Sequence, residues 1–258
     1  MNTVCIIPAR YESTRFPGKP LARIAGSPMI KWVYNRASAV RIFDQVIVAT
    51  DDSRIANAVK SFGGEYLMTP EDLKSGTDRV AFAANELNAD IIVNVQGDEP
   101  VILPQLLEDF CRPFVEPDVT MTTPVKLIKD SDELLNPNLV RVVLDRNGNA
   151  LYFSRSQIPF IRDVADKNEW LKYGQFYRHI GLYSYRRDFL LHLASLPRGK
   201  LEKLENLEQL RVLEHGFKIR TVLTDYISMS VDTPSDLELI EKYVKTHKLS
   251  VDDFHEKM

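Results

Sequence analysis

The sequence predicts an α/β protein with a mixed, mostly parallel sheet flanked by helices and a smaller inserted lobe. In the first 95 residues, short runs of β-branched residues alternate with helical stretches. After residue 124 the pattern changes to strands joined by turns, and a strand and a helix of the first kind return after residue 216. An alternating β-α-β-α order is typical of a parallel sheet with right-handed crossover connections.

The first half of the chain is predicted to supply the parallel sheet. Apolar, β-branched runs predict strands at residues 4–7, 45–49, 65–68 and 90–95. Helical periodicity predicts helices at residues 28–40, 53–62 and 77–87, between and after these strands. Gly63 and Gly64 mark the end of the second helix, because glycine commonly follows a helix C-terminus.

The second half is predicted to form the lobe and then to return to the core. Strands are expected at residues 140–144, 150–154, 180–185 and 217–223, a loop at 162–174, a charged helix at 201–216 and a last helix at 233–246. We therefore expect one domain, residues 1–258, with a core of residues 1–129 and 217–258 and a lobe of residues 130–216.

Composition excludes several classes of function. A net charge of -3 and the lack of an extended basic stripe argue against a nucleic-acid partner. No apolar run reaches the roughly 20 residues that span a bilayer, so no membrane partner is expected. The two cysteines, Cys5 and Cys111, provide no disulfide framework, which favours a cytoplasmic, reducing location.

A basic loop follows the first predicted strand. Arg10, Arg15 and Lys19 lie in a turn-rich stretch, and the first 40 residues hold six Lys or Arg and one Glu. Open α/β sheets bind ligands at the carboxyl ends of their strands, and clustered cations there favour phosphate. Since Gly18 is the only glycine in this loop, it matches neither a Walker loop nor a G-x-G-x-x-G turn. The alternative is a solvated basic loop whose prolines set its turns.

A second candidate for nucleotide binding precedes the helix predicted at residues 77–87. Ser75 and Thr77 are suited to cap this helix, and its free N–H groups could meet an anion or a base edge. Gly76 and Arg79 belong to the same stretch. Helix capping alone would also explain these residue types, so both interpretations stay open.

Two aspartates are candidates for a metal site. Asp98 follows a predicted strand and the bend at Gly97, and Asp232 precedes the last helix, which Pro234 opens. Carboxylates at the rim of a sheet suit Mg²⁺ that is bound together with substrate phosphates. Asp232 also fits the alternative role of a helix N-cap.

Polar residues in the predicted lobe form a further candidate site. His179 and Tyr183 have the spacing that places them on one face of a strand. His179 taken alone is typical of a hydrogen-bonded structural histidine. Leucines and glutamates recur at three-residue intervals from Leu201 onward, which is typical of an amphipathic helix with charge pairs.

Together these segments resemble the cytidylyltransferases that activate 3-deoxy-manno-octulosonate (Kdo), the CMP-Kdo synthetases. Eight stretches match in the family's order and cover nearly the whole chain: IPARYESTRFPGKPL, VATDD, SGTDR, NVQGDEP, ALYFSRSQIP, RHIGLY, LEQLRVLE and VDTPSDLE. Any one of them would be weaker evidence than the ordered set.

The resemblance implies a fold of the nucleotide-diphospho-sugar transferase type, Mg²⁺ as cofactor and a homodimer. It implies a reaction in which the anomeric hydroxyl of a 3-deoxy sugar acid attacks the α-phosphate of CTP in line, with Mg²⁺ assistance, and yields CMP-Kdo and pyrophosphate for lipopolysaccharide biosynthesis. The core would bind nucleotide and metal, and the lobe would bind sugar and form the dimer.

By position, the resemblance also assigns roles to residues of this chain. The catalytic residues would be Lys19, Arg10, Arg15 and Asp98. The nucleotide would contact Pro8, Ala9, Arg10, Arg15, Lys19, Ser75, Gly76 and Arg79. The sugar would contact Gln96, Arg155, His179, Tyr183, Glu208 and Gln209, and the metal Asp98 and Asp232. No side chain is predicted as a dedicated general base.

Two alternatives remain at this point. One is the same reaction on a related sugar acid, either an 8-amino Kdo analogue or, against the chemistry of the first loop, a sialic-type sugar. The other is a protein that binds CTP without turnover. The presence of Asp98, Asp232 and Lys19 argues against this alternative. Pyrophosphate release separates an enzyme from a binding protein.

Overall fold

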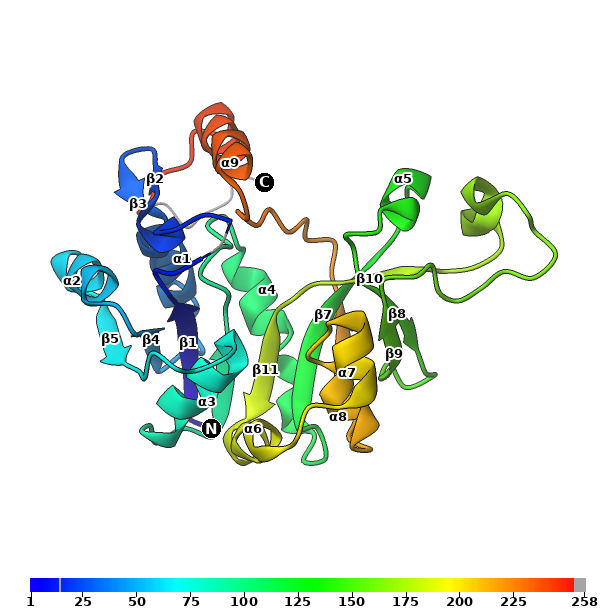
Figure 1. Ribbon diagram of the computed structural model, residues 1–258, viewed down its shortest axis with the longest axis horizontal. Coiled ribbons are helices and arrows are strands. Elements are labelled where there is room, and N and C mark those ends of the chain that lie inside the picture. The colour runs from blue at the N-terminus through cyan, green and yellow to red at the C-terminus, as the bar shows by residue number, and fades with distance from the viewer. Residues whose placement is uncertain (14, 253–258) are drawn as a thin grey trace. The chain divides into compact units, whose positions relative to one another are not determined.

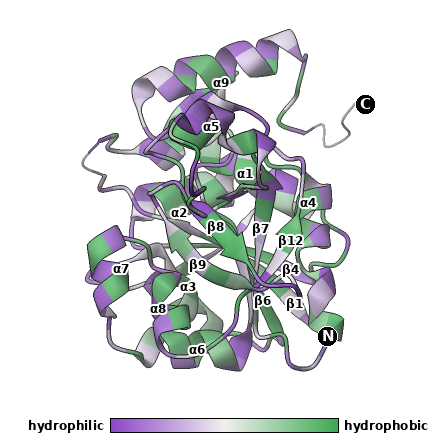
Figure 2. Ribbon diagram, turned by 90° about the vertical axis from the view of Figure 1, so that its right-hand side faces the viewer, coloured by the Kyte–Doolittle hydropathy of each residue, from purple (hydrophilic) through white to green (hydrophobic). Residues whose placement is uncertain are grey.

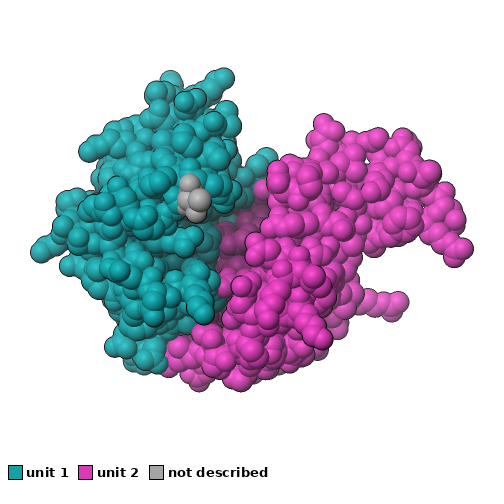
Figure 3. Space-filling model, viewed as in Figure 1, with its two compact units in different colours: residues 1–109, 227–258 teal, residues 110–226 magenta. Residues whose placement is uncertain are grey.

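The computed structural model describes residues 1–13 and 15–252 and divides into two compact units. The first unit comprises residues 1–109 together with the C-terminal segment from residue 227, and the second comprises residues 110–226 (Figure 3). The predicted lobe of residues 130–216 lies inside the second unit. That unit begins earlier because the strand β7, Met121–Leu127, pairs with three of its other strands.

Parallel strands form the centre of the first unit (Figure 1). They are β1 (Thr3–Ala9), β4 (Gln45–Thr50), β5 (Glu65–Met68) and β6 (Ile91–Asn94), in the order β5-β4-β1-β6. In register, Ala9 pairs with Thr50 and Ile6 pairs with Asn94. Six of the seven β1 residues are buried, as expected for a central strand that reads as a continuous apolar run.

Helices complete the first unit. They are η1 (Lys19–Leu21), α1 (Met29–Ser38), α2 (Ser53–Ser61), α3 (Gly76–Asn85), α4 (Pro104–Asp109) and α9 (Pro234–Thr246), and a short hairpin joins β2 (Arg23–Ile24) to β3 (Ser27–Pro28). Figure 2 shows hydrophobic and hydrophilic residues alternating along α9. Its apolar side chains Ile240 and Val244 pack with Trp32 and Val231 in one buried cluster. This packing attaches the C-terminal segment to α1 and to the β2–β3 hairpin, because Met29 and Ile24 belong to the same cluster.

The second unit is built on a mostly antiparallel sheet. Its strands are β7, β8 (Arg141–Leu144), β9 (Ala150–Ser154), β10 (Tyr177–His179), β11 (Tyr183–Arg186) and β12 (Arg220–Leu223). All observed pairings within it are antiparallel except that of β12, which is parallel to β7. The strands of the first unit are therefore parallel and those of the second mostly antiparallel, which agrees with the mixed sheet that the sequence predicted.

Two predicted elements of the second unit are wrong in their continuity. The strand expected at residues 180–185 is interrupted: β10 ends at His179 and β11 begins at Tyr183. The helix expected at residues 201–216 is two helices, α7 (Lys200–Glu205) and α8 (Leu210–Glu214). It breaks at Asn206, whose φ of 53° is left-handed, a conformation that asparagine tolerates better than most residues.

The loop expected at residues 162–174 contains a 3₁₀ helix, η3 (Lys167–Lys172). Its Trp170 is buried and packs with Ile128, Leu134 and Phe176, which anchors this polar segment. The remaining helices are η2 (Arg112–Val115), α5 (Ser131–Leu135) and α6 (Arg187–Ser195). Among residues 1–13 and 15–252, no helix combines the length and apolar character needed to cross a membrane.

Candidate functional site

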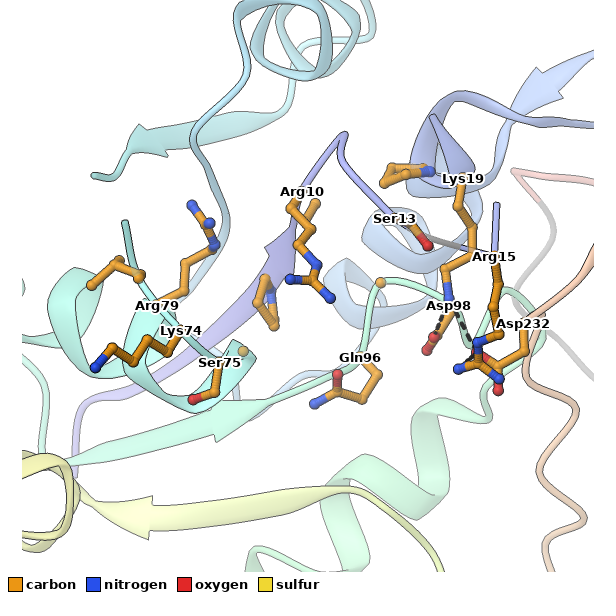
Figure 4. A pocket seen from close by; sticks show the side chains of 16 residues that line it. Arg10, Ser13, Arg15, Lys19, Lys74, Ser75, Arg79, Gln96, Asp98 and Asp232 are labelled. Atoms are coloured by element: carbon orange, nitrogen blue, oxygen red, sulfur yellow. Dashed lines mark hydrogen bonds and ion pairs between the residues drawn. The ribbon is translucent and has the colours of Figure 1, made fainter. Parts of the chain in front are cut away.

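A pocket of about 270 Å³ lies in the first unit at the carboxyl ends of β1 and β6 (Figure 4). Open α/β sheets bind ligands at this edge. All the residues expected to bind nucleotide or metal line the pocket: Pro8, Ala9, Arg10, Arg15, Lys19, Ser75, Gly76, Arg79, Asp98 and Asp232. Gln96, expected at the sugar, also lines it. The structure therefore brings residues from four segments that are distant in the sequence into one cavity, and these are residues that the sequence predicted.

The two candidate metal ligands meet at one ammonium group. Lys19 Nζ lies 2.6 Å from Asp98 Oδ2 and 3.5 Å from Asp232 Oδ1, and Arg15 Nη2 lies 3.1 Å from the same Asp232 oxygen. Figure 4 shows these side chains converging at one end of the pocket. Because both carboxylates contact one nitrogen atom, their contacting oxygens lie within about 6 Å of each other.

Backbone contacts hold the two aspartates in place. The N–H of Val231 donates to the Asp98 carbonyl at 2.9 Å, which joins the segment before α9 to the loop after β6. At Gly97 a β-carbon would lie 3.0 Å from the Pro8 carbonyl oxygen, so only glycine lets this loop approach β1 so closely. The two segments that carry the aspartates are therefore joined to each other, and the loop after β6 lies directly against β1.

Asp232 is not the N-cap of α9, and that alternative from the sequence is wrong. Thr233 is the N-cap, and its hydroxyl accepts from the Asp236 N–H. The Asp236 carboxylate accepts in return from the Asp232 and Thr233 N–H groups, at 3.0 and 2.8 Å. This capping box satisfies the helix terminus and leaves the Asp232 side chain to the basic loop.

The basic loop is folded by a contact between its two halves. Gly18 adopts a φ of 69° and donates its N–H to the Tyr11 carbonyl at 2.8 Å. The Tyr11 ring lies against Gly18, and the Arg54 guanidinium lies 3.2 Å from the ring centroid, which is a cation–π contact. Lys19 then begins η1, and its side chain enters the pocket.

The other end of the pocket is formed by the start of α3. Ser75 is the N-cap, and its hydroxyl accepts from the Asp78 N–H at 3.0 Å, so the capping interpretation is confirmed. Gly76 adds no side chain: a β-carbon there would lie 3.7 Å from Pro8 and 3.9 Å from Gln96. Capping and pocket lining therefore occur together in this segment.

Arg79 is buried and paired. Its Nη2 donates to Asp51 Oδ2 at 2.5 Å, and its Nη1 contacts the Thr69 hydroxyl. The sequence prediction missed this pairing, although Asp51 lies in the VATDD stretch directly after β4. Ser13, Leu73 and Lys74 also line the pocket and were not predicted; their positions beside predicted residues are the only signal in the sequence.

Most of the side chains expected at the sugar lie in the second unit. His179, Tyr183 and Gln209 are connected there by hydrogen bonds: Tyr183 donates to Gln209 Oε1 at 3.1 Å, and Gln209 Nε2 lies 3.5 Å from His179 Nδ1. Arg155 donates from Nε to the Glu205 carbonyl at 3.3 Å, and Glu208 is half-buried. Although His179 and Tyr183 occupy separate strands, their ring centroids are 5.5 Å apart.

Burial determines the charge states of this group. Desolvation, with a contribution from Arg178, lowers the pKa of His179 to about 3, so the imidazole is neutral at physiological pH. Desolvation, with a contribution from Glu208, raises the pKa of Tyr183, so its phenol keeps its proton. The three side chains therefore act as neutral donors and acceptors.

The acidic pair fits Mg²⁺ in one of the two ways in which proteins hold that ion. Among the residues that the structure describes, no group of three or more His, Cys, Asp or Glu could form an all-protein metal cage. Mg²⁺ is usually bound by one or two carboxylates plus substrate phosphates. Asp98 and Asp232 supply two carboxylates, and Arg10, Arg15 and Lys19 supply cations for the phosphates.

Comparisons with known proteins agree with this site. The profile of a family described as cytidylyltransferase matches residues 4–219. The chain is 51% identical over 250 residues to the 3-deoxy-manno-octulosonate cytidylyltransferase of Geobacter sulfurreducens, covering 95% of this chain and 100% of the relative. It is 46% identical over 255 residues to the protein of the same name from Thermodesulfovibrio yellowstonii, covering 96% and 100%.

Solved structures show the same fold. A CMP:2-keto-3-deoxy-manno-octonic acid synthetase complexed with CTP matches with a TM-score of 0.90 and 40% identity, over 96% of this chain and 100% of that one. A cytidylyltransferase from Leptospira borgpetersenii matches with a TM-score of 0.66 at 18% identity, over 98% of this chain and 90% of that one, which bears on the fold alone. The predicted fold class is confirmed.

Proposed function

Because the chain belongs to the 3-deoxy-manno-octulosonate cytidylyltransferase family, we propose that it couples CTP to Kdo. The anomeric oxygen of Kdo forms a bond to the α-phosphorus of CTP, the bond from that phosphorus to the oxygen shared with the β-phosphate breaks, and the hydroxyl proton passes to solvent. The products are CMP-Kdo and pyrophosphate. The family inferred from the sequence motifs is confirmed, and so is its nucleotidyltransferase class.

The observation that carries the proposal is the meeting of three cations and two carboxylates at the carboxyl edge of the parallel sheet. Phosphoryl transfer depends mainly on positioning and on neutralising charge at the transferred group and the leaving oxygens. Arg10 and Arg15 offer planar donors for phosphate oxygens, and Lys19 offers a compact charge. In this proposal these three side chains orient the triphosphate and stabilise the departing pyrophosphate.

Cytosine and ribose are proposed to lie at the opposite end of the pocket. Pro8 and Ala9 end β1, and α3 begins at Gly76 after its N-cap Ser75, so the lining there is partly apolar. Arg79 is fixed by Asp51. We propose that the Arg79 side chain forms part of the wall of this subsite and does not move, because its buried guanidinium already pairs with the partly buried carboxylate of Asp51.

Asp98 and Asp232 are proposed to hold Mg²⁺ together with the phosphates. When bound, the ion would neutralise phosphate charge and acidify the attacking hydroxyl. In the structure Lys19 balances both carboxylates. None of the described residues that line the pocket is a histidine, and the carboxylates of Asp98 and Asp232 are both paired with cations. We therefore assign no general base and leave the proton to solvent.

The sugar is proposed to contact His179, Tyr183, Gln209, Glu208 and Arg155 of the second unit. Arg155 suits the carboxylate of a sugar acid, and the neutral groups suit its hydroxyls. Gln96 of the first unit, whose amide donates to Asn94 Oδ1 at 3.1 Å, keeps its place in the prediction.

The function is tested by measuring pyrophosphate release with each of the four nucleoside triphosphates, against Kdo and against its 8-amino analogue. We expect release with CTP and Kdo only. Faster release with the amino sugar would assign the enzyme to that substrate instead. Binding of CTP without pyrophosphate release from either sugar would identify a CTP-binding protein.

A homodimer, a cytoplasmic location and a role in lipopolysaccharide biosynthesis are further parts of the proposal, supported by the resemblance to the family. Light scattering on the purified chain tests the dimer, with twice the mass of 29.6 kDa expected. A monomer at micromolar concentration would contradict it.

A further inference from the structure

A chain of hydrogen bonds extends from the expected sugar side chains to a residue that has no predicted role. Thr123 of β7 is fully buried, and its Oγ1 lies 2.9 Å from Nε2 of His179. The other imidazole nitrogen, Nδ1, faces the Gln209 amide at 3.5 Å, and Gln209 Oε1 accepts from Tyr183 at 3.1 Å. All four side chains are more than nine-tenths buried. Protein partners rather than water therefore decide where the protons lie.

The direction of these bonds follows from the single hydrogen of the Thr123 hydroxyl. Thr123 Oγ1 lies 2.8 Å from the carbonyl oxygen of Leu182 and 3.2 Å from that of Ile180. Carbonyl oxygens only accept, so the hydroxyl hydrogen is donated to them. Thr123 then faces His179 with a lone pair, and the imidazole must carry its hydrogen on Nε2.

The rest of the chain follows from that tautomer. A neutral imidazole protonated on Nε2 has a lone pair on Nδ1. Nδ1 therefore accepts from the Gln209 amide nitrogen, and the opposite amide orientation would set two acceptors against each other. Gln209 Oε1 is then directed at Tyr183, whose hydroxyl hydrogen it receives. The Tyr183 oxygen is left with its lone pairs as an acceptor for a ligand hydroxyl.

We propose that Thr123 is a positioning residue, which holds His179 in the Nε2–H tautomer and thereby sets the donors and acceptors that Gln209 and Tyr183 present to the sugar. The break between β10 and β11 makes this arrangement available, because it places the carbonyls of Ile180 and Leu182 within reach of β7. The consequence for sugar binding rests on the proposed function, whereas the tautomer of His179 does not.

The test combines nitrogen-15 spectroscopy with kinetics. The protein is labelled at its five histidines, and the His179 signal is assigned by its loss in His179→Gln. In the wild-type protein we expect Nε2 protonated and Nδ1 bare. A protonated Nδ1 in the wild-type protein overturns the proposal without any variant of Thr123.

Two substitutions then separate the hydroxyl from its surroundings. Thr123→Val keeps the shape but removes the hydroxyl, and we expect a shift toward the Nδ1–H tautomer with a KM for Kdo raised about tenfold, while the KM for CTP stays unchanged. Thr123→Ser keeps the hydroxyl and should therefore keep the wild-type tautomer and the wild-type KM for Kdo. Loss of the Nε2–H signal without rescue by serine, or an unchanged tautomer in the valine variant, overturns the assignment.

Thr122→Val is the matched control. Thr122 is the neighbouring, fully buried threonine of β7, and its hydroxyl contacts Phe110 and Ser184 rather than His179. We expect it to leave the His179 tautomer unchanged, and an equal shift in this variant would overturn the proposal. The two proposals can also fail separately. If the His179 tautomer responds to the Thr123 substitutions as expected but the protein releases no pyrophosphate, the hydrogen-bond assignment holds and the proposed function is rejected.

Discussion

Glu202→Gln is predicted to destabilise the second unit strongly. Glu202 of α7 has a side chain only 2% exposed, and its carboxylate accepts from Arg211 of α8 at 2.8 and 2.7 Å. Arg198 donates to it at 2.8 Å and the Gly199 N–H at 3.2 Å. These bonds hold together the two helices that flank Asn206, so they also fix the segment that carries Gln209.

The magnitude follows from the burial of the partners. The substitution removes the negative charge that contacts Arg211 at 2.7 Å, and the Arg211 side chain is only 8% exposed. Breaking a buried pair in this way costs about 3–5 kcal/mol. For a chain of this length the midpoint of thermal unfolding should fall by roughly 6 °C or more.

The assays are thermal unfolding and urea unfolding at neutral pH, both followed by circular dichroism, with Glu169→Gln as the matched control. Glu169 pairs with Lys172 at the surface, where their side chains are 43% and 67% exposed. An exposed pair contributes about 0–1 kcal/mol, so the control should barely move the midpoint. Equal losses of stability in the two variants would refute the reasoning.

A double variant examines the same pair by removing both of its charges. Glu202→Leu combined with Arg211→Met replaces both ions by apolar side chains of similar volume. Replacing a buried ion pair by apolar side chains often leaves the free energy of unfolding unchanged. We therefore expect the double variant to lose less stability than Glu202→Gln. A larger loss would show that the two charges stabilise the unit beyond their mutual compensation.

Three further outcomes are expected. Burial alone would raise the pKa of Glu202, but hydrogen bonds from Arg211 and Arg198 outweigh burial and lower the pKa below the ordinary value of 4.5. The stabilisation by the ionised carboxylate is therefore complete above pH 4.5 and is lost as the pH falls through the lowered pKa. The difference in urea midpoint between the wild-type protein and Glu202→Gln should vanish over the same range of pH. Gly97→Ala should weaken CTP binding in a calorimetric titration, because its β-carbon would press on the Pro8 carbonyl, whereas Gly181→Ala, which meets no atom within 4 Å, should bind CTP normally. Arg15→Ala should raise the KM for CTP more than the KM for Kdo, and equal increases would contradict its triphosphate role.

The parallel half of the fold was predictable from the sequence because its signals are local. The parallel strands of the first unit are short, mostly apolar runs separated by helical stretches, and α2 and α3 carry the side-chain caps Asp52 and Ser75. The position of Asp98 followed from one rule, that the carboxyl ends of parallel strands share an edge, whereas its meeting with Asp232 was expected from the family resemblance. The pairing of Arg79 with Asp51 did not follow, because it joins α3 to the end of β4 across 28 residues.

The second unit was less predictable because tertiary contacts override its local pattern. β7 was not predicted, since Pro124 lies in the middle of it and proline normally interrupts a paired strand. Pro124 is tolerated because it lies opposite the break between β10 and β11. At this position β7 pairs with neither of these two strands. The leucine repeat after Leu201 continues across Asn206, so periodicity alone could not reveal that the helix ends there.

The most direct test of the central claim, that Asp98 and Asp232 share one divalent cation beside the triphosphate, is a titration with Mn²⁺ in the presence of CTP and without sugar. Electron paramagnetic resonance of the same titration with and without protein separates protein-bound Mn²⁺ from Mn²⁺–CTP in solution, and the wild-type protein should bind the Mn²⁺–CTP complex. We predict that Asp98→Asn and Asp232→Asn each weaken this binding by about tenfold or more, because each loses one of two carboxylate ligands. Wild-type affinity for Mn²⁺–CTP in both variants would contradict the assignment.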